Sequence, residues 1–498
     1  MVRRMRPGAG SAGSPRRGRR AIVIGQMEPV FVRSAAATLV GLVLGGCLSG
    51  TVPTSTAVSP GGSPTGDPVS DPWPAAPEVP VGELDPSVAA ATDRLIDGFG
   101  PGRIDDAELS AVAASGDARL AWLVADMLRF AAPGSDERAL AQAFEALTST
   151  DPLADDRFGT VTWVAVTNLL LGWDLLEPPG YRERKARLFL AVEPAWEPFF
   201  EDPNAAIDWR WVTWGGVLID DREVGDGRSC RRGCIPALDD PLLTSAADGA
   251  WYADWRPVFG LVVGEEAVAF PRHIMEVHEM VNLTVGGRRV GLPYCTLCAS
   301  AQAYLLDDVP GSTSPLVLRT SGLLSRSNKL MYDLETWSTF NTFTGRATSG
   351  PLHDANALLE QVTVTSTTWG AWKAAHPATR IVARDGGIGS AYPDDPLEGR
   401  DAAGPIFPTG PIDPRLPVHH RVIGVVHPDG TPIAFPVEEA TSAIADGQRV
   451  QHAGVETYED GGLRVRLVGG EELPAHEAFW FAWSQFHPET TVWSSVLR

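Results

Sequence analysis

The spacing of apolar residues changes once along the chain, and the change predicts two structural regions. Between residues 85 and 204, apolar side chains recur every three or four positions, the spacing of an amphipathic helix. Two such stripes are Leu120, Leu123, Val124, Met127 and Leu128, and Leu140, Ala143, Phe144 and Leu147. Turn residues around Pro133 and Pro152 interrupt the pattern. The spacing therefore predicts a helical domain over residues 85–204.

From residue 205 to 498 the pattern becomes short β-type runs separated by turn residues. Residues 258–271 and 422–436 repeat one another, since each contains a strand, a tight turn, a second strand and the tripeptide Ala-Phe-Pro. We therefore predict a β-rich domain with a duplicated hairpin unit. The fold class is α+β, and the order of helices and breaks in the first domain is similar to a HEAT-like helical pair.

The amino terminus has the pattern of an export signal. Residues 34–48 are apolar and follow Arg33, and the stretch is too short for an ordinary transmembrane helix. The sequence Leu-Gly-Gly-Cys ending at Cys47 resembles a bacterial lipoprotein processing box, although a plain signal peptide that contains a cysteine is an alternative. Met27 is a second candidate start. We expect residues 1–47 to be a signal peptide and Cys47 to carry the lipid.

Residues 48–84 are rich in Pro, Ser, Thr and Gly, which predicts a disordered linker between anchor and folded body. The chain is therefore expected to be extracytoplasmic and lipid-anchored. Its formal net charge of −21 would repel phosphate backbones, so no nucleic-acid partner is expected. The helical domain contains no catalytic group of residues, and we expect it to act as a scaffold or to contact a protein partner, which would make the protein a cell-envelope interaction module. A substrate-facing groove is the alternative.

The cysteines fall into a pattern of one plus two plus two. Of the five cysteines, Cys47 stands alone and the other four form the close pairs Cys230/Cys234 and Cys295/Cys298, which is typical of an exported protein with paired thiols. The first pair is predicted to be a loop disulfide. Alternatively, the two arginines between these cysteines lower a thiol pKa and make the pair a resolving partner for Cys295 and Cys298.

The central candidate site lies between Pro271 and Ala301. A helix that carries His278 and a strand that leads into Cys295 would bring an imidazole close to two sulfurs. One interpretation is a thiol–disulfide site, with Cys295 as the nucleophile, Cys298 as the resolving thiol and His278 tuning protonation. The second is a copper or zinc site formed by Cys295, Cys298 and His278, with His273 as a further ligand. The third is a structural disulfide, or two buried thiols, in a β core.

Several neighbouring residues are candidates for support of this site. His278 and Glu279 begin a partial HExxH zinc-protease motif, but Asn282 stands where the second histidine is required, so a protease is not predicted. Glu279 can act as a general acid or base, or form a salt bridge. The candidate supporting residues are Glu279, Asn282, Tyr294, Asp239, Asp240, Asn328 and Asp333. Asp239 and Asp240 orient a ligand or form a turn, and Asn328 and Asp333, with Arg326, line the pocket or cap turns.

The β-rich part resembles the bacterial and archaeal domain-of-unknown-function family 3179. The resemblance extends from about Trp209 to Trp493. The matching segments include residues 235–241, 269–271, 278–282, 285–287, 294–298, 321–324, 331–333, 344–345, 369–372 and 479–483. The resemblance implies no established reaction, although the naming of some relatives as similar to selenoproteins favours redox chemistry at the cysteine pair. This chain has Thr296 where the family commonly has Pro, and Ala299 where it commonly has Gly.

Overall fold

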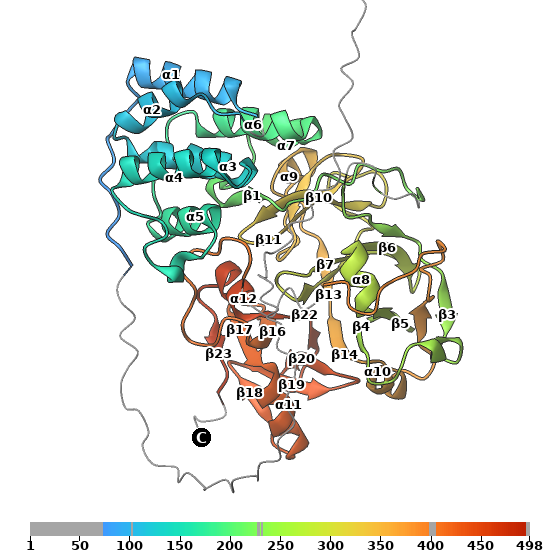
Figure 1. Ribbon diagram of the computed structural model, residues 1–498. Helices are drawn as coiled ribbons and strands as arrows, with labels where there is room; N and C mark the ends of the chain where they lie inside the picture. Colours follow the sequence, from blue (N-terminus) through green and yellow to red (C-terminus); the bar gives the residue numbers. More distant parts are fainter. Residues whose placement is uncertain (1–72, 101–102, 227–229, 231–232, 398–404, 495–498) are drawn as a thin grey trace, which may run out of the picture. The chain divides into compact units, whose positions relative to one another are not determined.

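A computed structural model describes residues 73–100, 103–226, 230, 233–397 and 405–494 (Figure 1). All of them belong to one compact unit, Asp71–Arg498. The predicted signal peptide, the lipidation site Cys47 and most of the predicted linker lie outside the described residues. In the described part of the chain, no helix combines the length and the apolar character needed to cross a membrane.

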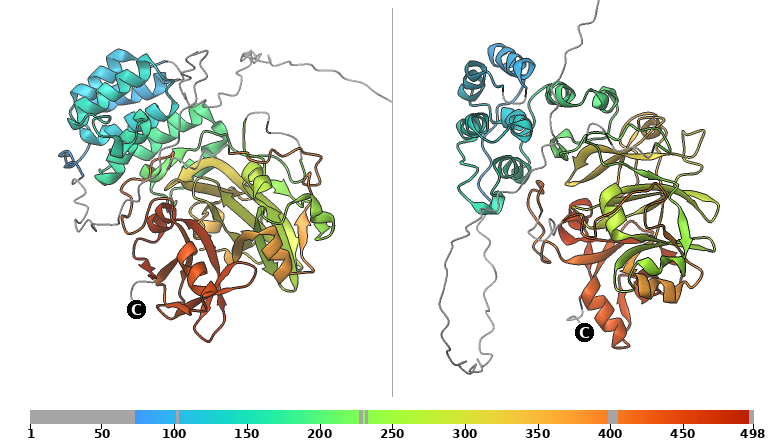
Figure 2. Two further views of the ribbon diagram at one scale, coloured as in Figure 1. Left: turned by 60° about the horizontal axis from the view of Figure 1, so that its bottom comes forward. Right: turned by 45° about the vertical axis from the view of Figure 1, so that its right-hand side comes forward.

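Helices form the first part of this unit, in blue to green in Figure 1. They are α1 (Pro86–Gly98), α2 (Asp106–Ala114), α3 (Ala121–Phe130), α4 (Ser135–Thr148), α5 (Thr162–Gly172), α6 (Tyr181–Val192) and α7 (Glu197–Glu201). Asp85 and Asp105 cap α1 and α2, because each carboxylate accepts backbone N–H groups that the first turn leaves unpaired. The view in Figure 2 shows the helices stacked side by side.

The two predicted apolar stripes are buried in α3 and α4, as expected. The hydrophobic cluster of the helices continues onto Leu323, Leu330 and Tyr332 in the β-rich part. Polar contacts join the same parts, since the Trp196 indole N–H donates to the Ser321 carbonyl at 2.7 Å. The helices and the first sheet therefore share one core.

Five sheets make up the β-rich part, as far as the structure describes it. The first has the order β1-β10-β11-β12, and the second has the order β13-β9-β7-β6-β2, with β8 paired to β7. The strands of the first are β1 (Val212–Trp214), β10 (Leu318–Ser325), β11 (Asn328–Asp333) and β12 (Thr339–Asn341). Those of the second are β2 (Leu238–Asp239), β6 (Met280–Val285), β7 (Arg288–Cys295), β8 (Ser300–Ala301), β9 (Ala303–Leu305) and β13 (Glu360–Val362).

The third, fourth and fifth sheets have the orders β14-β4-β5-β15-β3, β22-β16-β17-β23 and β18-β19-β20-β21. The strands of the third are β3 (Leu243–Ser245), β4 (Pro257–Val263), β5 (Glu266–Pro271), β14 (Val364–Thr368) and β15 (Arg380–Val382). The fourth contains β16 (Arg421–Val426), β17 (Pro432–Pro436), β22 (Ala475–Phe479) and β23 (Thr491–Val492). The fifth contains β18 (Val450–His452), β19 (Val455–Glu459), β20 (Leu463–Leu467) and β21 (Glu472–Leu473).

Short helices accompany the sheets: α8 (Arg272–His278), α9 (Pro351–Asp354), α10 (Trp369–Ala375), α11 (Val437–Ala445) and α12 (Trp480–Phe486). The α+β class and the order of a helical part before a β-rich part are confirmed. The two segments predicted to repeat form the hairpins β4–β5 and β16–β17. These hairpins account for only two of the five sheets, so a duplicated hairpin alone does not describe the β-rich part.

Candidate functional site

Cys295 and Cys298 lie at the end of β7 and in the turn that leads to β8. The Cys298 backbone N–H donates to the Cys295 carbonyl at 3.3 Å, and β7 pairs with β8 directly beyond the turn. Both side chains are free thiols with exposed fractions of 2% and 0%. The Cys298 carbonyl accepts the Phe479 backbone N–H at 2.9 Å. The turn is therefore held between the second and fourth sheets.

A buried ion pair lies beside these thiols. Glu279 follows the last residue of α8 with a φ of 52°, and this left-handed residue ends the helix before β6 begins. Its Oε2 is 2.9 Å from Lys329 Nζ of β11, and its Oε1 accepts the Thr296 hydroxyl at 2.8 Å. Lys329 Nζ also donates to the Glu279 carbonyl at 2.7 Å. Both charges thus have partners, as burial requires.

The two thiols differ in acidity. Burial raises the pKa of Cys295, but the hydrogen bond with Cys298, the Lys329 charge and the Lys329 backbone amide outweigh burial and the Glu279 charge, so its pKa lies below the ordinary value. Burial, the hydrogen bond with Cys295 and the negative charges nearby raise the pKa of Cys298 well above the ordinary value. Cys295 is therefore the sulfur that ionises first.

A pocket of about 100 Å³ gives access to this group. Cys295, Thr296, Glu279 and Lys329 line one part of it. The other lining residues are Gly215, Val217, Ile235, Leu297, Thr320, Gly322, Leu323, Leu324 and Phe407. Of the two cysteines, Cys295 is among the lining residues and Cys298 is not.

His278 makes its contacts elsewhere. Its Nδ1 lies 2.7 Å from the Pro236 carbonyl, and its Nε2 accepts the Tyr392 hydroxyl at 2.7 Å. Burial lowers the pKa of His278, so the ring is neutral at neutral pH. His273, on the same helix, stacks on Tyr252 with ring centres 5.3 Å apart. The charged groups that act on Cys295 are Glu279 and Lys329, and they take the place that the sequence analysis gave to His278.

Asn282, Asp239 and Asp240 belong to structural networks outside the pocket lining. Asn282 bridges strands, because its Nδ2 donates to the Leu318 carbonyl and its Oδ1 accepts the Leu318 N–H, both at 3.0 Å. Asp239 pairs with the buried Arg319 at 2.7 Å. Asp240 forms an ion pair with Arg289. These contacts hold strands together, and neither the ligand-orienting role nor the turn predicted for the two aspartates includes these ion pairs.

The remaining candidates have structural contacts too. Tyr294 packs on Phe259 with ring centres 4.8 Å apart, in the core of the second and third sheets. Asp333 caps a turn, because its carboxylate accepts the N–H groups of Val317 at 3.0 Å and Thr336 at 2.8 Å. Asn328 and Arg326 do not line the pocket either. Asn328 Nδ2 donates to the Ser300 hydroxyl at 3.3 Å, and Arg326 stacks on Trp211 at 4.2 Å.

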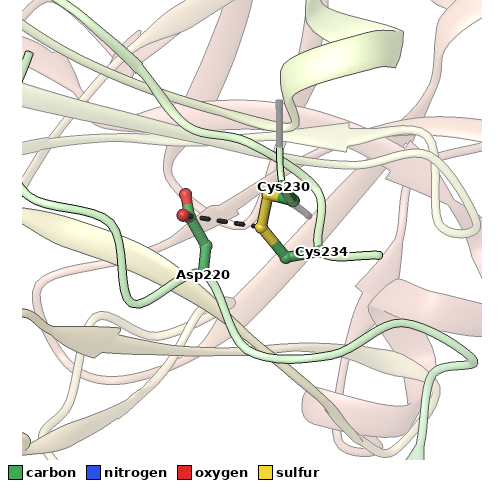
Figure 3. A group of neighbouring side chains, drawn as sticks. All are labelled: Asp220, Cys230 and Cys234. Carbon is green, nitrogen blue, oxygen red and sulfur yellow. Dashed lines mark hydrogen bonds between the residues drawn. A yellow bond between two sulfur atoms is a disulfide. The ribbon is translucent and has the colours of Figure 1, made fainter. Parts of the chain in front are cut away.

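Cys230 and Cys234 form a disulfide, with Cα atoms 5.2 Å apart. Figure 3 shows the buried Asp220 beside it, with Oδ1 3.6 Å from Cys234 Sγ. In the described part of the chain, these are the three residues whose ligand atoms lie within 4.8 Å of one another, as a metal would require. The thiolates needed for metal binding are absent from a disulfide, so the group can hold copper or zinc only after reduction. Cys295, Cys298, His278 and His273 form no such group among the described residues.

A buried histidine next to the cysteine turn predicts acid sensitivity. His476 of β22 is 3% exposed and lies 4.9 Å from the Phe343 ring, in contact with the cluster that holds both thiols. Burial, and secondarily the charge of His487, lowers its pKa from 6.5 to about 3. The pKa of His476 is lower in the folded protein than in the unfolded chain, so the unfolded chain binds a proton first as the pH falls. The stability that the neutral His476 contributes is therefore complete above pH 6.5 and is lost as the pH falls toward 3.

We therefore expect the free energy of unfolding to fall by about 3 kcal/mol from this group alone between pH 7 and pH 4.5. Urea unfolding at a series of pH values measures the slope. His476→Phe keeps an aromatic side chain beside Phe343 and should flatten the slope over that window, with comparison made at pH 8, where neither side chain titrates. An unchanged slope in the variant would place the acid sensitivity in other groups.

Lys329, a functional candidate, was missed in the sequence analysis. Lys329 could have been recognised because it is a lysine within the strand Asn328–Asp333, in which every residue is buried. A lysine in such a strand requires an acidic partner, but the sequence does not show which one.

The fold and the site define an α+β protein with a buried Cys-x-x-Cys pair, one cysteine of which lines a pocket, and an adjoining Lys–Glu ion pair. Residues 232–468 match the family described as "Protein of unknown function (DUF3179)", and this part of the chain is similar to that family. The match is shorter than the resemblance described above and leaves out the helical part. No curated protein and no solved structure matches the chain.

Proposed function

We propose that the protein is a thiol–disulfide oxidoreductase in which Cys295 is the nucleophile and Cys298 the resolving thiol. The observation that carries this proposal is the asymmetry of the pair. Cys295 lines a pocket and its thiol has a lowered pKa, whereas Cys298 is not among the lining residues and its thiol has a raised pKa. A structural pair of thiols needs neither the pocket nor the difference in acidity.

The reaction would proceed in two exchanges. The Cys295 thiolate attacks one sulfur of a substrate disulfide, its S–S bond breaks, and the leaving thiolate takes up a proton. Cys298 then loses its proton and attacks the Cys295 sulfur of the mixed disulfide, which releases the second substrate thiol. Two electrons pass from the cysteine pair to the substrate, and the protein ends as the Cys295–Cys298 disulfide. An external dithiol, itself oxidised to a disulfide, would return the pair to its reduced state.

The Lys329–Glu279 ion pair contributes to both thiol–disulfide exchange steps. Lys329 lowers the pKa of Cys295 through its charge and its backbone amide. Glu279 acts on both sulfurs through its charge, and we assign it as the acceptor of the Cys298 proton. Its side chain is held by Thr296 at 2.8 Å and by Lys329 at 2.9 Å, so the acceptor has a fixed position.

Cys298→Ser is expected to trap a mixed disulfide at Cys295 when the folded, full-length protein is treated with bis(2-hydroxyethyl) disulfide. The wild-type protein should instead form a Cys295–Cys298 disulfide, and Cys295→Ser should form no adduct at Cys298 over the same time. Peptide mapping by mass spectrometry separates these products from the Cys230–Cys234 disulfide. Adduct at Cys298, or no modification of either thiol in the folded protein, would refute the proposal.

Metal binding is a second candidate function, and it is favoured by the group Asp220, Cys230 and Cys234 rather than by the central pair. For the chain as a whole, we propose a lipid anchor at Cys47, a linker over residues 48–84, a HEAT-like domain over residues 85–204 and a β-rich domain over residues 205–498. The helical domain is proposed as the surface for a protein partner. These assignments are supported by the sequence pattern.

A duplicated unit larger than a hairpin is also proposed. In the third and fourth sheets, an antiparallel strand pairs with the hairpin on one side and a parallel strand pairs with it on the other. Each unit has a helix after the hairpin, α8 or α11, and a tryptophan-rich helix before the parallel strand, α10 or α12. The Trp372 indole donates to the Thr379 hydroxyl at 2.9 Å, and the Trp483 indole donates to the Thr490 hydroxyl at 2.8 Å.

A further inference from the structure

The pocket that Cys295 lines is small and mostly apolar. Its volume of about 100 Å³ is well below the roughly 300 to 1,000 Å³ of a pocket for a drug-sized ligand. Lys329 and Glu279 are the charged residues of its lining, and they pair with one another at 2.9 Å. The aliphatic and aromatic lining residues are Val217, Ile235, Leu297, Leu323, Leu324 and Phe407. The pocket therefore suits a molecule of a few heavy atoms without net charge.

The position of Cys295 favours a small oxidant in the same way. Its exposed fraction is 2%, and the turn that contains it is held by the hydrogen bond from the Phe479 N–H to the Cys298 carbonyl at 2.9 Å. A disulfide must bring two sulfurs and their substituents to this thiol. Hydrogen peroxide has two heavy atoms, and its O–O bond accepts two electrons from a thiolate. A peroxide of this size fits the pocket more easily than a large disulfide does.

Lys329 has one N–H group left for a molecule in the pocket. An ammonium group has three N–H donors. Two of those of Lys329 are directed to Glu279, at 2.9 Å from Oε2 and 2.7 Å from the carbonyl oxygen. The third has no hydrogen-bond partner among the described residues. Because Lys329 lines the pocket together with Cys295, this N–H can donate to the oxygen that leaves when a peroxide bond breaks.

We propose that Cys295 reduces small, uncharged hydroperoxides, with hydrogen peroxide as the preferred one. The inference rests on the roles that the proposed function gives to Cys295 and Cys298, and it adds a second class of oxidant. The Cys295 thiolate attacks one oxygen and the O–O bond breaks. The other oxygen leaves as water or an alcohol, with the proton that Cys295 released, and Cys295 becomes a sulfenic acid.

Cys298 completes the reaction. Its sulfur attacks the Cys295 sulfur, the S–O bond of the sulfenic acid breaks, and the hydroxide that leaves takes up the Cys298 proton to form water. Two thiols and one hydroperoxide thus give the Cys295–Cys298 disulfide, one water and one further water or alcohol. The external dithiol of the proposed function returns the pair to its reduced state.

Two peroxides of different size provide the test, with the folded, full-length protein and N-acetylcysteine as the reference thiol. Relative to N-acetylcysteine, Cys295 should favour hydrogen peroxide over cumene hydroperoxide at least about tenfold. This factor is equivalent to about 1.4 kcal/mol, within the cost of forcing extra atoms into a packed site. Phe407→Ala shortens a lining side chain and should narrow the preference. Mass spectrometry of the Cys295 peptide after acid quenching measures each rate.

The products identify the reacting sulfur. Hydrogen peroxide should convert the wild-type pair to the Cys295–Cys298 disulfide, and Cys298→Ser should stop at a Cys295 that has gained one oxygen. Oxidation of Cys295 by bis(2-hydroxyethyl) disulfide but not by hydrogen peroxide overturns this inference and leaves the proposed function standing. A preference between the two peroxides equal to that of N-acetylcysteine overturns the selection by size. Failure of Cys295 to react with any of these oxidants in the folded protein overturns both the proposed function and this inference.

Discussion

Lys329→Met is expected to lower the free energy of unfolding by about 3 to 5 kcal/mol, because it leaves the buried Glu279 carboxylate without a cation. Both side chains are nearly inaccessible, with exposed fractions of 5% for Lys329 and 11% for Glu279. Nζ also supplies a hydrogen bond to the Glu279 carbonyl. Urea unfolding followed by tryptophan fluorescence measures the loss. The control Lys373→Met removes an exposed pair with Asp254 and should cost less than about 1 kcal/mol.

Lys329→Met should also slow the reaction of the Cys295 thiol with iodoacetamide. Loss of the Lys329 charge raises the pKa of Cys295, and each unit of that rise lowers the thiolate fraction near neutral pH about tenfold. The double variant Lys329→Met/Glu279→Gln removes both charges, so it should recover most of the stability. It lacks the Glu279 charge, which raises the pKa of Cys295, as well as the Lys329 charge, which lowers it, so its Cys295 should regain the reactivity toward iodoacetamide that Lys329→Met loses. If Lys329→Met matches Lys373→Met in stability, the ion pair does not hold the site together.

Local sequence patterns predicted the elements that carry the site. The apolar stripes around Leu123 and Phe144 became α3 and α4, because helical spacing directs such residues to one face. The spacing of His278 and Cys295 predicted a helix followed by a strand, and α8 and β7 are those elements. The position of a helix or strand depends mainly on residues close together in sequence, so the apolar periodicity and the turn residues are enough to predict it.

The partners of the site come from distant parts of the chain, and no local pattern records them. Lys329 reaches Glu279 across 50 residues, because β10 and β11 bring it beside the end of α8. His278 bonds to Tyr392, which is 114 residues away, and to the Pro236 carbonyl, so both ring nitrogens have partners other than the thiols. The sequence shows that a histidine is near a cysteine pair along the chain, but the direction of its ring depends on which distant segment packs on the helix.

Arg129 illustrates the same limit between different structural regions. In the sequence it is one more basic residue in the last turn of an amphipathic helix, where its positive charge would interact favourably with the helix dipole. Its indole neighbours Trp163 and Trp214 come from α5 and β1, and Phe407 comes from a segment far along the chain. Only the packed structure shows that no carboxylate of the described residues pairs with it.

Gly424→Ala is expected to destabilise the protein by about 3 kcal/mol, because a methyl group on this buried strand residue would overlap the Trp483 ring. The ring cannot easily move aside, since it is 1% exposed and its indole N–H is held by Thr490 at 2.8 Å. Gly98→Ala is the control: it places a methyl group where no atom lies within 4 Å, at the end of α1, and should cost little or stabilise slightly. Thermal and urea unfolding measure both.

The proposed duplication extends this prediction to Gly260, whose Cβ would overlap the Trp372 ring. Trp372 is also fully buried, with its indole N–H on Thr379 at 2.9 Å. Gly260→Ala should therefore cost as much as Gly424→Ala. Combining Gly424→Ala with Trp483→Leu should cost less than the sum of the two single changes, because the smaller side chain makes room for the methyl group. A tolerated alanine at one glycine and not at the other would mean that the two sheets pack differently, and would remove the strongest physical argument for two copies of one unit.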